Sequence, residues 1–225
     1  MSERVIRLFV SSPSDVSTER RRAALVVEQL NGEFAGRVRI EPVLWEEHFY
    51  SSHAGFQDQI ANAAACDIVI AIFGGRLGTR LPASFPLHAA TGQAYPSGTA
   101  YEVLSAIEAR KAGQDLPDIY VFRFPQAPAP RLDAPDRSEV EAQWNALKSF
   151  FDTWFRRQGG EFIAVFYEYG STDDFASQVE KCLRQFLGRH GFVTRGPVWD
   201  RLTHGSPFPG LAAFEADRRA VFFGR

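Results

Sequence analysis

The segment that most constrains the fold is residues 67–73, DIVIAIF, which is followed at once by the glycine-rich sequence GGRLGT. An apolar run of this kind leaves no polar face for solvent, so a strand that contains it must be covered on both sides. The centre of a parallel sheet with helices on both faces provides that environment. We therefore expect residues 67–73 to form a central strand that opens into a loop at its carboxyl end.

Strand-like and helix-like segments alternate along most of the chain. The other strands are predicted at residues 5–10, 38–44, 118–124 and 162–167, and helices at 12–34, 56–64, 97–113, 138–157 and 172–187. Pro42 has no amide hydrogen to give to a neighbouring strand, which favours either an edge position for the second strand or a position of Pro42 at the end of that strand. The order SSPSD predicts a capping box at the start of the first helix, with Pro13 at its first helical position, and a start shifted by two residues is the alternative. This alternation predicts an α/β protein, an open parallel five-stranded sheet with helices on both faces.

Composition narrows the class of protein and its surroundings. The 225 residues are 45% hydrophobic and 23% charged, as in soluble globular proteins, and their number fits one large domain or one domain plus an appendage. Lys and Arg number 25 against 27 Asp and Glu, which argues against a surface built mainly to hold nucleic acid. Cys66 and Cys182 make neither a disulfide framework nor a metal set, and no apolar stretch is long enough for a membrane span. We expect a cytoplasmic protein with no membrane contact.

Several common kinds of active site are excluded by missing motifs. The chain has no G-x-G-x-x-G, no P-loop, no G-x-S-x-G and no HExxH sequence. A dinucleotide site of the Rossmann kind, an α/β-hydrolase elbow and a zinc site are therefore not expected. The chemistry left to this chain belongs to carboxylates and hydroxyls.

Polar residues gather where the predicted strands end. In open parallel sheets ligands bind outside the carboxyl ends of the strands. The residues placed there are Ser11, Ser12, Asp15, Trp45, Glu46, Glu47, Gly74, Gly75, Arg76, Gly78 and Ser97 to Glu102. Such a set suits a ligand with sugar hydroxyls, a phosphate and a flat base.

Glu102 is the candidate catalytic carboxylate of this set. It falls in the first turn of a predicted helix and off the core stripe formed by Val103, Leu104 and Ile107. A carboxylate there is stabilised by the helix dipole by about 0.3–1 kcal/mol and tends to stay ionised. From the residues alone, stabilising the start of the helix is an alternative role for Glu102.

Three segments together carry a resemblance to a known family. LFVSSPSDVSTERR at residues 8–21, DIVIAIFGGRLGT at 67–79 and SGTAYEVLSAIEA at 97–109 resemble the TIR-like domain at the N-terminus of many bacterial STAND-type proteins. That family is related to Toll/interleukin-1 receptor (TIR) domains and, more distantly, to nucleoside deoxyribosyltransferases. The resemblance implies a flavodoxin-like or TIR-like sheet in a domain that spans residues 1–187.

The tail carries a second resemblance. GSPFPGLAAFEADRRAVFFGR, at residues 205–225, is similar to the lead-in of a STAND-type P-loop NTPase domain. Residues 188–225 are therefore expected to be a linker and the truncated start of such a domain. ATP is expected only in the part of that NTPase that this chain lacks.

The family resemblance implies an activity. Catalytic TIR domains cleave NAD⁺ at the nicotinamide–ribose bond with a Glu in the helix after the third strand, and Glu102 matches that place. NAD⁺ is then a substrate, and neither a cofactor nor a metal is implied. The substrate-binding residues implied beside Glu102 are Ser11, Ser12, Asp15, Trp45, Arg76, Ser97 and Tyr101. A core position for Trp45, a surface position for Arg76 and a merely covering role for Tyr101 are the alternatives.

Three functions follow as hypotheses. The first is an effector that hydrolyses or cyclises NAD⁺ when its linked STAND NTPase and sensor domains oligomerise it, as in anti-phage defence. The second is a non-catalytic module that signals by self-association through TIR–TIR contacts. The third is an N-glycosyl transferase that acts on nucleosides. The Pro- and Ala-rich insertion at residues 81–96 is expected to cover the site or to provide an oligomer contact.

Overall fold

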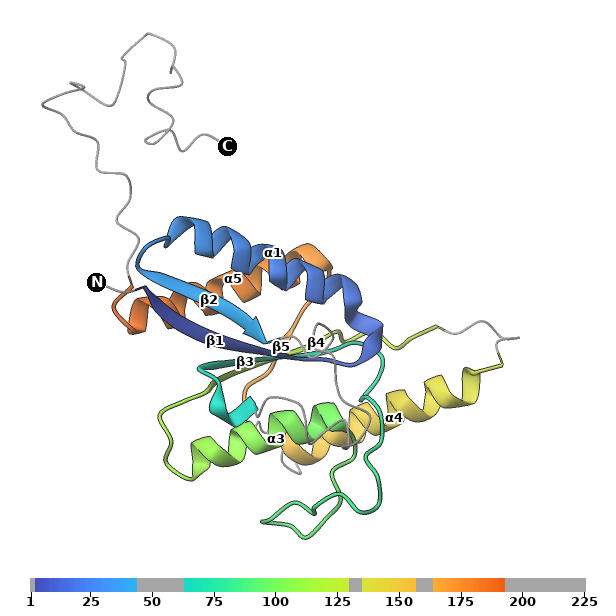
Figure 1. Ribbon diagram of the computed structural model, residues 1–225. Helices are drawn as coiled ribbons and strands as arrows, with labels where there is room; N and C mark the ends of the chain where they lie inside the picture. Colours follow the sequence, from blue (N-terminus) through green and yellow to red (C-terminus); the bar gives the residue numbers. More distant parts are fainter. Residues whose placement is uncertain (1–2, 44–62, 130–134, 157–163, 193–225) are drawn as a thin grey trace, which may run out of the picture.

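The computed structural model describes residues 3–43, 63–129, 135–156 and 164–192 (Figure 1). Five parallel strands form one sheet in the order β2-β1-β3-β4-β5. Their bounds are β1 Arg4–Ser11, β2 Val38–Val43, β3 Ile68–Phe73, β4 Asp118–Arg123 and β5 Tyr167–Glu168. This is the flavodoxin-like order, and the prediction of an open parallel five-stranded α/β sheet is confirmed.

β3 and β2 occupy the places that their composition predicts. All six residues of β3 are fully buried, and the strand lies between β1 and β4 at the centre of the sheet. Among the described residues β2 pairs with β1 alone, so Pro42 lies on an edge strand, where a missing amide hydrogen costs least.

Helices cover both faces of the sheet, as predicted (Figure 1). α1 (Ser17–Glu33) and α5 (Thr172–Arg189) lie on one face, and α3 (Gly98–Lys111) and α4 (Arg137–Trp154) lie on the other. Each pair of helices closes its own core over the sheet. Of the predicted 56–64 helix, most lies outside the described residues, and a short 3₁₀ turn, η3 (Ala63–Ala65), precedes β3. In the part of the chain that the structure describes, no helix has the length and apolarity to cross a bilayer.

The start of the first helix differs from the prediction. A 3₁₀ turn, η1 (Ser14–Val16), comes first, α1 begins at Ser17, and no side chain caps either element. The hydroxyl of Ser12 does not cap the helix because it accepts a hydrogen bond from Arg20 instead. The prediction of a capping box was therefore wrong. The predicted apolar stripe of this helix is confirmed, because its residues are all buried: Ala23, Val27, Leu30 and Phe34.

The fifth strand also differs from the prediction. It was expected at residues 162–167, of which 162–163 lie outside the described residues, and in the described part it comprises only Tyr167–Glu168. Phe166 instead packs its ring against Phe151 and Phe155 of the α4 region, with ring centroids 4.9 and 5.9 Å away. Phe166 is thus used for packing on a helix rather than for pairing in the sheet, and Val165 is exposed.

Candidate functional site

The strand order identifies the carboxyl ends of β1 and β3 as the expected place of a ligand site. The chain leaves β1 toward β2 on one side and later returns through β3 to the other side, so the direction of winding reverses there. Ligands of doubly wound sheets bind at such a reversal, outside the carboxyl ends of the strands. Ser11 is the last residue of β1, and Gly74 and Gly75 directly follow β3.

A buried hydrogen bond between Ser11 and Glu102 lies at this position. The Ser11 Oγ donates to Glu102 Oε2 over 2.6 Å and joins β1 to α3. Ser11 is fully buried and Glu102 is only 7% exposed. The structure therefore brings together two residues that are 91 positions apart in the chain and that both belong to the predicted site.

The environment of Glu102 changes its acidity. Burial raises the pKa of Glu102 to about 7, and the hydrogen bond from Ser11 acts in the opposite direction. The prediction that Glu102 lies off the core stripe is confirmed, since the core under α4 includes Val103 and Leu104 but not Glu102. The predicted position in the first turn was wrong: Glu102 lies beyond the first turn of α3, and burial raises its pKa where the helix dipole was expected to favour the ionised form. The helical face that carries Glu102 also carries Ala106, which packs with Phe9 and Ala63 in a buried cluster, so α3 is covered on a second face. Perturbed carboxyl groups of this kind are typical of functional sites.

The loop between β1 and α1 is held by Arg20. Its Nη1 donates to Ser12 Oγ over 2.9 Å and to the carbonyl oxygen of Pro13 over 2.7 Å. Arg20 was not among the residues predicted at the site. The signal available was its position in the first turn of the helix that follows the loop, where it can reach back to the loop backbone.

Asp15 joins the loop after β1 to the loop after β3. Its Oδ2 accepts a hydrogen bond of 2.7 Å from the backbone amide of Gly75. A Cβ atom at Gly74 would lie 2.7 Å from Asp15 Oδ2 and 2.7 Å from Val16 Cγ1, so only glycine fits there. Asp15 is thus at the site, and one of its carboxylate oxygens holds the two loops together.

Ser97 is occupied by the start of α3. Its Oγ accepts from the amide of Ala100 over 3.1 Å and donates to the carbonyl oxygen of Leu77 over 2.8 Å, and the residue is fully buried. The Oε1 of Gln143 on α4 accepts from the amides of Leu77 and Gly78 over 3.2 and 3.3 Å. Ser97 is therefore the N-cap of α3 and positions this helix. Gln143 is a supporting residue that was not predicted from the sequence.

The other predicted residues lie in different surroundings. Tyr101 packs edge-on against Phe85 and Tyr95, with ring centroids 4.8 and 5.0 Å away, so its ring contacts the 81–96 insertion. Arg76 is half-buried in the loop after β3. Trp45 lies outside the described residues. Within the described ranges, no group of three His, Cys, Asp or Glu side chains is placed to hold a metal ion.

Comparison with known proteins adds little to this geometry. No family model matches the chain, and no curated protein matches it. A solved flavodoxin-like domain from Synechococcus sp. is similar with 12% identity and a TM-score of 0.33 over 81% of this chain and 99% of that domain. The fold class therefore rests on the strand order and the placement of the helices.

Proposed function

We propose that this chain contains a TIR-like domain that cleaves NAD⁺ at the bond between nicotinamide and ribose, with Glu102 as the catalytic residue. The observation that carries the proposal is the buried Glu102 carboxyl, held by Ser11 where the winding of the sheet reverses. The resemblance of residues 8–21, 67–79 and 97–109 to TIR-like domains supports the same activity.

A single carboxylate is sufficient for this chemistry. The bond between the ribose C1′ and the pyridinium nitrogen breaks, its electron pair leaves with nicotinamide, and the departing molecule is neutral because its ring was cationic. The leaving group therefore needs no proton from an acid. The sugar passes through a state that resembles an oxocarbenium ion, which glycosidases also stabilise with a carboxylate. Water then forms the new C1′–O bond and releases a proton, which gives ADP-ribose.

The position of Glu102 suits this role electrostatically. A carboxylate shielded from water opposes a developing positive charge more strongly than one in solvent. With a pKa of about 7, Glu102 is ionised in a large fraction of molecules at neutral pH. Because the ionised form is the active one in this scheme, the rate of cleavage should increase as the pH rises through 7.

We further propose that self-association activates the domain in the full protein. The similarity of residues 205–225 to the lead-in of a STAND-type NTPase favours an effector that its linked NTPase and sensor domains oligomerise. An anti-phage role and a cytoplasmic location accompany this proposal. ADP-ribose and a cyclised form are the two products that the chemistry allows.

Nicotinamide release by the purified chain of residues 1–225 tests the activity. We expect release from NAD⁺ that increases faster than linearly with protein concentration and that increases further with a crowding agent. Glu102→Gln should remove it by at least about 100-fold, since the charge that opposes the transition state is lost. The matched control is Glu141→Gln on the exposed side of α4, which should leave the rate unchanged.

Two further measurements separate the alternatives. A signalling module would be indicated by two results together. Light scattering would show equal self-association of the parent and Glu102→Gln, and the full protein would release no nicotinamide in triggered cells. Transfer of a base between deoxynucleosides, lost in Glu102→Gln and without nicotinamide release, would indicate the N-glycosyl transferase. Either result would contradict the proposed NAD⁺ cleavage.

A further inference from the structure

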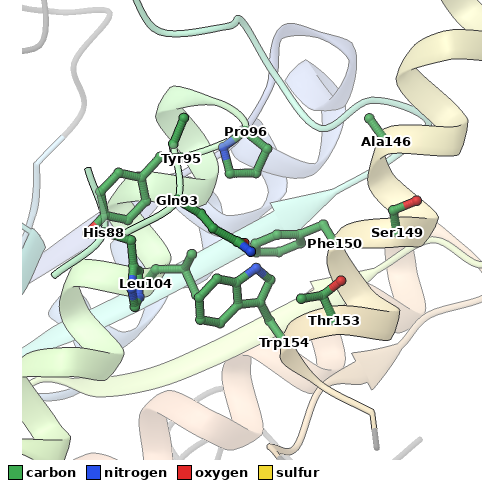
Figure 2. A pocket seen from close by; sticks show the side chains of 11 residues that line it. His88, Gln93, Tyr95, Pro96, Leu104, Ala146, Ser149, Phe150, Thr153 and Trp154 are labelled. Atoms are coloured by element: carbon green, nitrogen blue, oxygen red, sulfur yellow. The ribbon is translucent and has the colours of Figure 1, made fainter. Parts of the chain in front are cut away.

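A second site of interest is a cavity of about 240 Å³ that is open to solvent and lies between the 81–96 insertion, α3 and α4 (Figure 2). Gln93, Ala146 and Ser149 at its edge are exposed. Its lining comes from the end of the insertion, from Leu104 of α3, and from one side of α4 between Ala146 and Trp154. The lining includes neither Ser11 nor Glu102. The cavity is thus a feature of the insertion, which the proposed function does not use.

The chemistry of the lining is aromatic and uncharged. The rings of Tyr95, Phe150 and Trp154 form much of the wall, together with His88. No Asp, Glu, Lys or Arg belongs to the described lining. An anion or a cation would be partly desolvated against these rings and would gain no partner of opposite charge from the lining, so the cavity favours a neutral occupant.

One polar group is placed to orient such an occupant. Figure 2 shows the side chain of Gln93 reaching from the insertion toward Phe150 and Trp154. A glutamine amide offers both donors and an acceptor, and it pairs in two-point fashion with groups that present the complementary edge, such as adenine or a carboxamide. The flat rings beside it favour a flat partner, because aromatic rings gain most from stacked or edge-on contacts.

The insertion is fixed to α3, so the cavity is formed before any ligand arrives. The Nδ1 of His88 accepts from the amide of Thr91 over 3.2 Å, so Nε2 carries the hydrogen directed at Glu108 Oε1, 2.9 Å away. The other oxygen of Glu108 accepts from the hydroxyl of Tyr95 over 3.4 Å. The ring of His88 also packs on Trp154, with centroids 4.7 Å apart. One carboxylate therefore holds two residues of the lining, and a preformed site loses less entropy on binding.

We propose that this cavity binds a neutral, flat ring compound with an amide-like edge, the class that includes nucleobases and aromatic carboxamides. Its size is adequate, since an apolar cavity of roughly 150 Å³ holds benzene. The ring lies between the aromatic side chains, and its amide edge pairs with Gln93. This proposal does not depend on NAD⁺ cleavage at Glu102.

The test uses benzamide as the probe and the Trp154 indole N–H resonance as the readout, assigned by its loss in Trp154→Phe. We expect a saturable shift with a dissociation constant on the order of 1 mM or tighter, typical of a well-held ligand of this size. Cyclohexanecarboxamide keeps the amide and loses the flat ring, and benzoate keeps the ring and adds a charge. Both should bind at least about tenfold more weakly.

Variants that fill the cavity provide the second arm. Ala146→Phe places a ring in the space from α4 and should abolish the benzamide shift, and Ser149→Phe should do the same from the next turn. Ala142→Phe is the matched control, because Ala142 is exposed on the same helix and does not line the cavity. Any of three results would overturn the proposal. They are equal binding of the three probes, no saturable shift with benzamide, and benzamide binding that is retained in Ala146→Phe and Ser149→Phe when these variants are folded.

Discussion

At the scale of single residues, one hydrogen bond and its surroundings determine the charge of Glu102. Burial raises the pKa of this carboxyl because water can no longer stabilise the ionised form. The Ser11 hydroxyl stabilises the ionised form through the 2.6 Å hydrogen bond and limits the rise. The balance leaves a pKa of about 7, so both protonation states are accessible at neutral pH.

Ser11→Ala should therefore raise the pKa of Glu102. A hydrogen bond to a charged group contributes about 1.5–3 kcal/mol, which corresponds to an increase of roughly 1–2 pH units. ¹³C NMR of the labelled carboxyl measures this directly, and the rise of nicotinamide release with pH should move by the same amount. Ser105→Ala is the control, because Ser105 donates to the backbone carbonyl of Glu102 and not to its carboxylate. An unchanged titration in Ser11→Ala would contradict the role of this bond.

Glu102→Gln should make the free energy of unfolding less sensitive to pH. Because the folded-state pKa of about 7 exceeds the ordinary 4.5, the folded parent binds more protons than its unfolded chain between these values. The parent consequently loses stability as the pH rises through this window, by about 3 kcal/mol in all, and the glutamine variant does not. In urea unfolding, the free energy of unfolding of the variant minus that of the parent should be larger at pH 8 than at pH 4 by that amount. Glu141→Gln, on exposed α4 surface, should track the parent, and a Glu102→Gln profile parallel to the parent's would count against a perturbed carboxyl.

At the scale of elements, the sequence was most informative where burial leaves a simple pattern. The uniformly apolar 67–73 run predicted the central β3, and Pro42 predicted the edge position of β2, because each depends on the environment of one strand. Periodicity could not show that α3 is covered on two faces, since the η3 turn that covers the second face is far away in sequence. Burial of Glu102 was missed for that reason.

The insertion shows a different limit of sequence reasoning. Its Pro- and Ala-rich composition predicted an unusual loop after β3, and nothing in it predicted the contacts of His88 and Tyr95 with Glu108. Those contacts depend on where α3 and α4 lie. The same limit applies to the site, where strand ends identified Ser11, Asp15 and Glu102 but not Arg20, whose role depends on how the loop folds back.

Glu108→Ala should loosen the insertion. It leaves the buried His88 without its acceptor, and an unsatisfied buried group costs about 1–3 kcal/mol. Urea unfolding measures the loss, and hydrogen exchange should increase at His88, Thr91 and Gly92, whose amides bond within the insertion. Glu141→Ala removes an exposed ion pair with Arg137 on α4 and should cost less than about 0.5 kcal/mol. Equal losses in the two variants would show that Glu108 does not hold the insertion.

At the scale of the whole molecule, the two cores on either side of the sheet meet at the strands that carry the site. Residues of β1 and β3 contribute to the core under α1 and α5, and other residues of β3 contribute to the core under α3 and α4. The Ser11–Glu102 hydrogen bond links β1 to the α3 side, so the geometry of the site depends on both layers. α5 completes the first layer, and it continues to Arg189, two residues past the end that the sequence predicted.

Residues 188–192 are part of this layer, which leads to a prediction about shortened chains. Arg189 forms an ion pair with Asp118 and a 3.0 Å hydrogen bond with Tyr120. Phe192 packs against the core under α1 and α5, and its amide bonds to the carbonyl oxygen of Leu187 over 2.9 Å. A chain shortened to residues 1–192 keeps these contacts, and a chain shortened to 1–187 loses all of them.

We expect the 1–192 chain to unfold in urea with the same free energy as residues 1–225. The 1–187 chain should be less stable by about 2 kcal/mol or more, since it loses a partly buried aromatic side chain and the partner of Asp118. Phe192→Ala in the 1–192 chain separates the two contributions and should reproduce part of the loss. If 1–187 and 1–192 have equal stability, the folded unit ends where the sequence placed its boundary. A 1–192 chain less stable than 1–225 would instead show that residues 193–225 contribute to the stability of the fold.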